Sequence, residues 1–317
     1  MASLGVDYGT GSWKTALLVE GCTPELRGLS SPDDVRDELA QIDGRHPGLP
    51  IVLPSGFGIP LKRVQDLDDR DLFEIALRRE APTERGLSHF LFALKTSHLN
   101  AYCIPGVKLL PSVPIHRKVN RVDMGTSDKL CTAAFFVSRL HAQGARLEDI
   151  DFVALDVGEA FRAILAVRGG KIVDGLGGTA GGIGPQSRGS IDGELAYLYD
   201  WGSKEYIYHG GARDVEERFG GYGHAAFWEE LEKDLLMFLS FHDLKTIVVA
   251  GRRKHEVRDR LGERFRIEVA DQEDEGFEAA IGAAVLADGI AGGRYAPLVA
   301  HLGLRDVSDR VLDWIYR

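Results

Sequence analysis

The residues best suited to chemistry lie near the start of the chain, in the segment Asp7-Tyr8-Gly9-Thr10-Gly11-Ser12. Glycines in a tight turn let backbone N–H groups approach an anion closely, and the Thr10 and Ser12 hydroxyls add hydrogen-bond donors. An aspartate at the end of a strand can hold a hydrated Mg²⁺ beside bound phosphates. The segment does not follow the Walker A pattern GxxxxGK[ST]. Since glycines are also expected in a plain hairpin turn, it is consistent with a phosphate-binding loop or with a simple turn.

A second candidate loop starts at Asp156-Val157-Gly158 and is followed, after a predicted hairpin, by a glycine-rich segment. Six of the eleven residues from 175 to 185 are glycine, whereas average usage is about 7%. Ordering so many glycines costs much conformational entropy. The segment therefore has two interpretations, a ligand-binding loop and a flexible surface loop.

Two segments near the end of the chain suit a nucleotide site as well as ordinary packing. The apolar run 247–250 predicts a buried strand that ends at Gly251 and Arg252. A base or ribose could lie against the backbone there, and an ordinary turn explains the pattern equally well. In the segment EAAIGAAVLA, which starts at Glu278, small residues share one face of a predicted helix. Close helix packing is the usual reason for a glycine in a helix, and it requires no ligand.

Other residues that could carry chemistry form weaker patterns. The 10 histidines show neither an HxH nor an HExxH spacing, so a zinc site is not expected. The basic residues Arg117, Lys118 and Arg121 could clamp an anionic substrate, although a solvated surface is the usual reason for such a run. Arg188, which follows the glycine-rich segment in GPQSRGS, offers the same two interpretations.

Apolar periodicity predicts that these segments lie in two similar α/β halves. The strings LGVDYGTGSWKTALLVEG and VALDVGEAFRAILAVRGG each predict two strands around a turn, and they align with Asp7 on Asp156. A Ser-Pro-Asp-Asp start at position 31 and a Thr-Ser-Asp start at position 126 predict helix N-termini. Residues 104–120, rich in proline and basic residues, predict an extended chain. The remaining predicted strands are 50–53, 171–174, 246–250 and 265–269, and the remaining predicted helices are 87–94, 227–238 and 276–290.

A polar stretch from Gln143 to Asp149 predicts a boundary between two domains. The first domain is expected over residues 1–145 and the second over residues 146–317, with the end of the chain able to pack back on the first domain. Asp7 and Asp156 then end equivalent strands, one in each domain.

Composition narrows the class of protein. The chain has 317 residues, of which 44% are hydrophobic and 27% charged, as in ordinary globular proteins. Its 38 Lys and Arg against 48 Asp and Glu give a net charge of −10, which disfavours nucleic acid and anionic membranes as partners. The 3 cysteines form no CxxC pair, and no apolar run reaches the ~18 residues of a membrane span. The expected compartment is therefore the cytoplasm.

Taken in order along the chain, these segments resemble the superfamily of actin-like ATPases, sugar kinases and acetate kinases. Its order is phosphate loop one, connecting helix one, phosphate loop two, adenosine loop and connecting helix two, which correspond here to 4–19, 122–141, 152–168, 246–253 and 276–291. The strings GVDYGTGS and AAIGAAVLA carry the match. Within the superfamily, IPGVKLLPSVP, VDMGTSDKL and GGTAGGIGP resemble a family of predicted butyrate kinases known mainly from archaea.

The resemblance implies an α/β fold with two ribonuclease-H-like domains that face each other across a nucleotide-binding cleft. It implies that ATP and Mg²⁺ bind there, with Asp7 and Asp156 on either side of the metal, and that the γ-phosphoryl group passes to a short-chain carboxylate. Asp156, Arg188 and Arg121 are the catalytic candidates. The residues expected to bind the nucleotide are Gly9, Thr10, Gly11, Ser12, Lys14, Gly158, Gly177, Gly178, Thr179, Gly181, Gly182, Gly251 and Arg252.

The sequence departs from the superfamily pattern at two positions. The second phosphate loop lacks its usual extra glycine and hydroxyl residue, and its Glu159 would lie near phosphate unless it helps to hold the metal. Arg252 stands where many relatives have a glycine. Two other functions stay open: a kinase for a hydroxyl acceptor, with Asp123 or Asp128 as base, and a nucleotide-gated module that acts on a partner protein. A homodimer is also left open.

Overall fold

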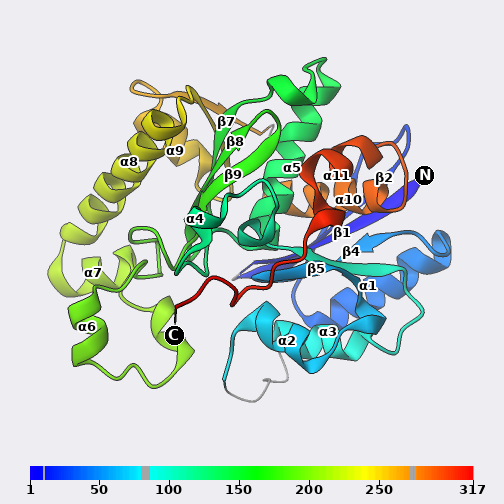
Figure 1. The fold of residues 1–317 in the computed structure, drawn as a ribbon, viewed down its shortest axis with the longest axis horizontal. Coiled ribbons are helices and arrows are strands. Elements are labelled where there is room, and N and C mark those ends of the chain that lie inside the picture. Colours follow the sequence, from blue (N-terminus) through cyan, green and yellow to red (C-terminus); the bar gives the residue numbers. More distant parts are fainter. Residues whose placement is uncertain (10, 80–85, 271–273, 275, 317) are drawn as a thin grey trace.

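The computed structural model describes residues 1–317 except residues 10, 80–85, 271–273, 275 and 317, and it contains two β-sheets (Figure 1). The first sheet has the strand order β3-β2-β1-β4-β6-β5 and the second has the order β11-β10-β7-β8-β9. The first sheet consists of β1 (Ala2–Gly9), β2 (Ser12–Val19), β3 (Glu25–Leu29), β4 (Ile51–Val52), β5 (Gly58–Arg63) and β6 (Ala101–Pro105). The second consists of β7 (Phe152–Val157), β8 (Arg162–Arg168), β9 (Lys171–Leu176), β10 (Thr246–Ala250) and β11 (Arg266–Val269).

The two sheets repeat one topology. In each, the first three strands form an antiparallel meander, and a fourth strand pairs in parallel with the first (β4 with β1, β10 with β7). A further strand then extends each sheet in parallel, and β5 adds an antiparallel edge strand to the first sheet alone. This repeated order confirms the two ribonuclease-H-like units expected from the sequence.

Helices surround both sheets and also lie between them (Figure 1). Their bounds are α1 (Pro32–Arg45), α2 (Asp69–Ala76), α3 (Leu87–Leu94), α4 (Ile115–Lys118), α5 (Ser127–Ala142), α6 (Gly193–Leu198), α7 (Ala212–Phe219), α8 (Tyr222–His242), α9 (Lys254–Leu261), α10 (Glu278–Ile290) and α11 (Ala296–Leu302). Short 3-10 turns include η2 (Val107–Leu109) and η4 (Lys204–Tyr208). Within the described residues, none of these helices is long and apolar enough to span a membrane.

Local sequence signals explain where several helices begin. The Ser31 side chain accepts a hydrogen bond from the Asp34 backbone N–H, with Pro32 in the first turn, so the predicted start of α1 is confirmed. The start of α5 after Thr126 is confirmed as well. Asp68 forms a capping box with Asp71 at the start of α2.

The extended chain predicted over residues 104–120 is only partly correct. Residues up to Pro105 form β6, but the segment then folds into η2 and α4. The reason is tertiary: Val107, Leu109 and Leu110 are buried. The Nζ atom of the buried Lys108 also donates hydrogen bonds to the Val311 and Asp313 carbonyls, at 2.6 and 2.8 Å.

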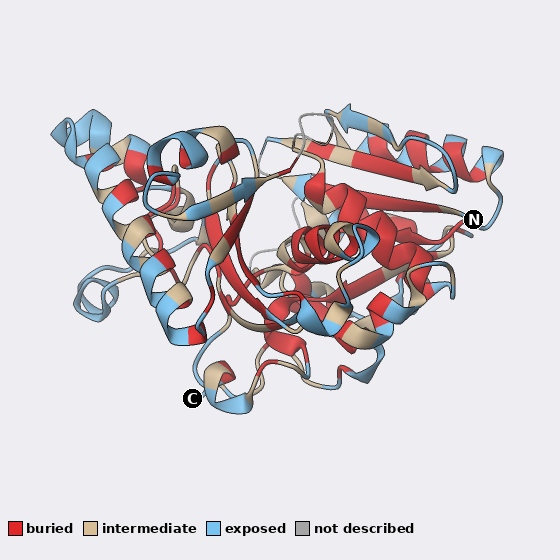
Figure 2. Cartoon of the chain, turned by 90° about the horizontal axis from the view of Figure 1, so that it is seen from above, coloured by how far each residue is buried: buried red, intermediate tan, exposed pale blue. Residues whose placement is uncertain are grey.

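Buried residues form three clusters that assign the helices to the sheets. The outer face of the first sheet packs against α1 and α3, and that of the second sheet packs against α8 and α9. The third cluster contains residues of α5, α10 and α11, and Figure 2 shows buried residues concentrated along the strands and the helices between them. The helices α5 and α10 pack on each other, and α10 also packs on β1 and β2.

The end of the chain returns to the first half of the sequence. Arg310 pairs with the buried carboxylates of Asp71 and Glu74 on α2, at 2.8 and 2.7 Å. Lys118 pairs with Asp309 at 2.8 Å. The C-terminal segment is therefore tied by charge to α2 and α4.

Close contact between α10 and β1 gives a stability prediction. A Cβ atom on Gly5 would lie 2.0 Å from the Ala280 carbonyl oxygen, so backbone would have to move. We expect Gly5→Ala to lower the free energy of unfolding by about 1–3 kcal/mol. Gly28→Ala is the control, because Gly28 is also in a strand but has nothing within 4 Å of its Cβ position. Urea unfolding of both variants checks this, and equal midpoints would contradict the packing argument.

Candidate functional site

A cleft of about 1120 Å³ lies where the hairpin turns of the two sheets meet. The structure brings most of the predicted site residues to its lining. From the first hairpin these are Asp7, Gly9, Gly11, Ser12 and Lys14. From the second half they are Asp156, Gly158, Gly177, Gly178, Thr179, Gly251 and Arg252.

Some predicted residues lie elsewhere. Thr10 is outside the described residues. Gly181 packs near Leu176, and Gly182 lies against Arg162 and Glu230; neither is among the residues that line the cleft.

The two arginines predicted to be catalytic do not line the cleft either. The Arg188 guanidinium stacks on the Trp201 ring at 4.3 Å, and its Nε donates to the carbonyls of Tyr206 and His209. Arg188 thus stabilises the segment that precedes α7 through these contacts. Arg121 is exposed. Arg188 follows the glycine-rich segment in the sequence, but its side chain points to the neighbouring loop and not into the cleft.

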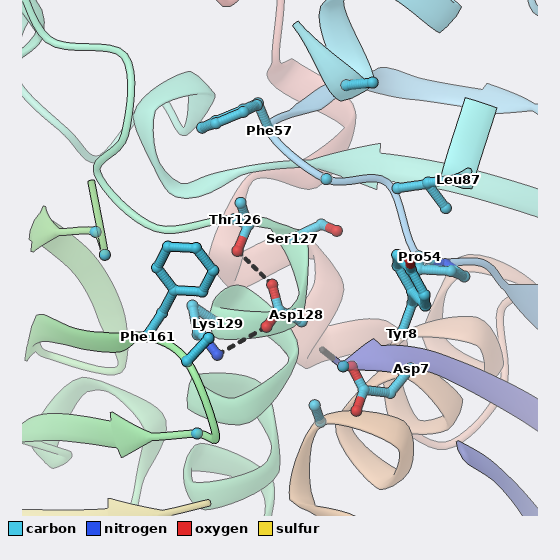
Figure 3. A pocket seen from close by; sticks show the side chains of 18 of the residues that line it. Asp7, Tyr8, Pro54, Phe57, Leu87, Thr126, Ser127, Asp128, Lys129 and Phe161 are labelled. Carbon is cyan, nitrogen blue, oxygen red and sulfur yellow. Dashed lines mark hydrogen bonds and ion pairs between the residues drawn. The ribbon is translucent and has the colours of Figure 1, made fainter. Parts of the chain in front are cut away.

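The floor of the cleft holds a lysine that the sequence analysis missed. Lys129, in the first turn of α5, lies 2.8 Å from Asp128 Oδ2 and donates to Asp156 Oδ2 at 3.1 Å. Figure 3 shows its pairing with Asp128, whose other oxygen accepts from Thr126. Asp156 also accepts from the Thr132 hydroxyl at 3.3 Å. Lys129 therefore joins the start of α5 to the end of β7.

Burial and neighbouring charges shift the pKa values of the titratable side chains at the floor of the cleft. Burial, together with the nearby Asp128 and Asp156, raises the pKa of Asp7 to about 6, although Lys14 at 3.8 Å and Lys129 oppose the shift. Burial alone would raise the pKa of Asp128, but Lys129 and the Thr126 hydrogen bond lower it. Burial would lower the pKa of Lys129, but the surrounding carboxylates raise it. The floor is a dense set of carboxylates that two lysines only partly neutralise.

The Asp123 carboxylate binds the glycine-rich loop, and this contact accounts for one of its glycines without any bound ligand. Its Oδ2 accepts hydrogen bonds from the Thr179 backbone N–H and hydroxyl, at 2.9 and 2.7 Å, and its Oδ1 accepts from Gly125. A Cβ on Gly177 would lie 1.7 Å from Asp123 Oδ1. Glycine is therefore required at 177 because this carboxylate lies against its backbone.

A charged pair at the cleft joins the segment after β10 to the turn of the second hairpin. Arg252 lies 3.2 Å from Glu159 Oε2, and its Nη2 is 3.5 Å from Ser12 Oγ. The Glu159 carboxylate lies so close to Gly11 that a Cβ there would be 2.3 Å from its Oε2. Glu159 thus occupies the space between the two predicted phosphate loops.

The donor set at the floor fits a hydrated magnesium ion. Over the described ranges, no three His, Cys, Asp or Glu side chains are grouped so that they could hold a metal by themselves. Mg²⁺ usually keeps several waters and uses one or two carboxylates beside substrate phosphates. The carboxylates of Asp7, Asp128 and Asp156 face the ammonium groups of Lys14 and Lys129 at this floor, and a divalent cation would balance the remaining negative charge. Asp7 and Asp156 are therefore suitable ligands, directly or through water.

Solved structures with a similar fold include acetate kinases. The acetate kinase of Entamoeba histolytica matches with a TM-score of 0.56 and 10% sequence identity, over 86% of this chain and 97% of that chain. The acetate kinase of Porphyromonas gingivalis gives a TM-score of 0.51 and 11% identity, over 89% of this chain and 92% of that chain. At this level of identity the likeness is one of fold, and it confirms the fold class expected from the sequence.

At the level of sequence, no curated protein matches this chain. One family pattern, described as "Protein of unknown function (DUF1464)", matches residues 5–317. Because the match spans nearly the whole sequence, the chain belongs to the DUF1464 family.

Proposed function

We propose that this protein is an ATP-dependent kinase that transfers the γ-phosphoryl group of ATP to a small carboxylic acid. The observation that carries the proposal is the meeting of two equivalent hairpins at one cleft, with Asp7 from the first and Asp156 from the second on its lining. The likeness of the fold to acetate kinases supports an acceptor of the carboxylate class.

Residues at the two turns suit the binding of a nucleotide. The backbone at Gly9, Gly11 and Gly158, with the Ser12 hydroxyl and the Lys14 ammonium, would bind the phosphates. The adenosine would lie along Gly251 and Arg252, at the end of β10. Mg²⁺, held by Asp7 and Asp156, would supply charge neutralisation at the phosphates.

The proposed reaction balances without a proton transfer. A carboxylate oxygen of the acceptor bonds to the γ-phosphorus while the bond from that phosphorus to the β–γ bridging oxygen breaks, and ADP leaves. An acid with a pKa of ~4–5 is already ionised at pH 7, so no general base is required. Lys129 and Lys14 provide positive charge at the floor, where anionic oxygens come together.

The surroundings of the candidate bases favour this acceptor over a hydroxyl group. A hydroxyl acceptor needs a carboxylate free to take its proton. Asp123 is engaged by Thr179 and Gly125. Asp128 is paired with Lys129 and has a lowered pKa, which makes it a weaker base.

An ADP-release assay tests the class of acceptor. Protein and Mg-ATP are incubated with carboxylates of two to eight carbons and, in parallel, with sugars and simple alcohols. We expect release that depends on a carboxylate. Release that depends only on a hydroxyl compound would overturn the proposal, and so would release that no small molecule stimulates.

Glu159 provides a prediction about nucleotide affinity. Its carboxylate lies between the two loops that would hold the phosphates, at 3.2 Å from Arg252. A negative charge a few ångströms from phosphate costs on the order of 1 kcal/mol in water. We therefore expect Glu159→Gln to bind Mg-ATP roughly fivefold more tightly in calorimetry.

The matched control is Glu256→Gln. Glu256 has the same side-chain exposure of 42% and pairs with Arg253, the next residue after Arg252. Its affinity for Mg-ATP should not change. Weaker binding by Glu159→Gln would instead assign Glu159 to the metal.

A further inference from the structure

One end of the cleft is an apolar wall that the nucleotide does not account for. The wall is built from three separate parts of the first half of the chain and from the segment before β8. Its members are Phe57, Leu72, Phe73, Leu87, Phe92 and Phe161, all of which line the cleft. In Figure 3, Phe57, Leu87 and Phe161 lie around the Thr126–Asp128–Lys129 end of the site.

The wall is exposed to the cleft. Phe73 on α2 is 42% exposed and Phe92 on α3 is 59% exposed. A single exposed apolar residue is ordinary, but several around one concave surface mark a ligand-binding site. The six side chains carry no hydrogen-bonding group, so they suit hydrocarbon and not a polyhydroxy compound.

Two cations near the wall, Arg78 and Lys204, are already engaged. Arg78 donates to Glu205 at 2.9 Å. The Lys204 ammonium donates to the Ala76 carbonyl and lies over the Phe57 ring, 5.0 Å from its centroid. At the floor, Lys129 pairs with Asp128 and Asp156, and Lys14 pairs with Asp7. Mg²⁺ would neutralise the same carboxylates, which leaves these two ammonium groups to attract an acceptor's carboxylate.

The cleft has room for two ligands. Its volume of about 1120 Å³ exceeds the roughly 300–1,000 Å³ typical of a site for one small molecule. The wall members from the first half of the chain, Phe57, Leu72, Phe73, Leu87 and Phe92, lie outside the two hairpin turns that would hold a nucleotide. A two-carbon or four-carbon acid at the floor would reach little of the wall, whereas a longer or aromatic acid would cover it.

We infer that the acceptor is a carboxylic acid with an apolar body larger than that of butyrate, either a chain of six or more carbons or an aromatic ring. The inference rests on the proposed function and specifies its substrate class. Each methylene that the wall removes from water raises affinity roughly fourfold. The gain should continue from butyrate to hexanoate.

The test compares acids of similar pKa in one assay. Acetate, butyrate, hexanoate and phenylacetate are each incubated with protein, Mg-ATP and hydroxylamine, which traps an acyl phosphate as a hydroxamate. We expect kcat/KM to rise at least tenfold from butyrate to hexanoate and to phenylacetate. Equal values for all four acids would overturn the inference while leaving the proposed function in place.

Two wall variants and a matched control locate the effect. Phe73→Ala and Phe92→Ala should raise KM for hexanoate and phenylacetate severalfold and leave KM for acetate unchanged. Phe219→Ala is the control, because Phe219 is 59% exposed like Phe92 but is not among the residues of the cleft lining. If the wall variants behave like the control, the inference is wrong.

Absence of any hydroxamate would contradict the proposed function, and binding then decides the inference separately. Hexanoate and phenylacetate are titrated calorimetrically into protein with Mg-ADP. Binding that Phe73→Ala weakens, and that acetate does not reproduce, supports an apolar acid site. No binding of either acid would overturn it.

Discussion

Replacing Asp156 with asparagine is expected to lower the turnover of Mg-ATP by on the order of 10²-fold or more. Asparagine keeps the shape of the side chain and can still accept from the Thr132 hydroxyl, which lies 3.3 Å from Asp156 Oδ2. It removes the negative charge that Lys129 and a hydrated Mg²⁺ would share. Asp7→Asn should act in the same direction, since Asp7 faces the same floor from the other hairpin. The ADP-release assay measures the loss of turnover, and calorimetric titration of nucleotide with and without Mg²⁺ measures the accompanying loss of Mg-dependent binding.

The control for this prediction is Asp151→Asn. Asp151 precedes the opposite end of β7, where its carboxylate accepts from the Gly169 backbone N–H at 2.6 Å. It therefore shares a strand with Asp156 but lies away from the cleft. The variant should bind Mg-nucleotide as the unaltered protein does. Mg-dependent binding that survives in both Asp7→Asn and Asp156→Asn would refute the assignment of these residues.

Lys129→Met is expected to have a comparable effect on turnover and an additional effect on stability. The side chain is only 17% exposed and lies within 3.1 Å of both Asp128 and Asp156. Its loss leaves two partly buried carboxylates without this cation, which costs at most the roughly 3–5 kcal/mol of a fully buried pair. Mg²⁺ would neutralise the same carboxylates. We therefore expect Mg²⁺ to raise the melting temperature of Lys129→Met more than that of the unaltered protein.

Lys118→Met separates this effect from the general cost of breaking a buried pair. Lys118 is 3% exposed and lies 2.8 Å from Asp309, far from the cleft lining. It should destabilise the fold without a special response to Mg²⁺ and without loss of turnover. Equal responses to Mg²⁺ in the two variants would show that Lys129 and the metal do not share carboxylates.

Much of the fold could be predicted because its signals are local. The strands of both hairpins, β10, and the helices α1, α5 and α10 follow from apolar periodicity and N-terminal caps. The edge strand β3 could not be predicted, because its sequence ELRGL is largely exposed and the strand exists through pairing with β2. The turns at residues 107–118 depend on contacts with the C-terminal segment.

Only the site residues that lie near the ends of equivalent strands could be brought together from the sequence. Asp7 and Asp156 end equivalent strands, so the sequence repeat was enough to bring them together. Lys129 gave no such signal, because only the packing of α5 places it between Asp128 and Asp156. Conversely, the glycine content of residues 175–185 was a poor guide to ligand binding, because Gly177 is glycine to accommodate the Asp123 carboxylate. Arg188, close in sequence to that loop, stacks on Trp201.

We propose that this cleft transfers the γ-phosphoryl group of ATP to a carboxylate, and one measurement tests the transfer directly. Phosphorus NMR of the protein with Mg-ATP and hexanoate follows both products at once. We expect ADP to appear together with an acyl phosphate resonance, neither to form without the acid, and Asp156→Asn to suppress both. Formation of ADP and inorganic phosphate, unchanged by any carboxylate, would overturn the proposed transfer to a carboxylate and would favour a nucleotide-gated ATPase instead.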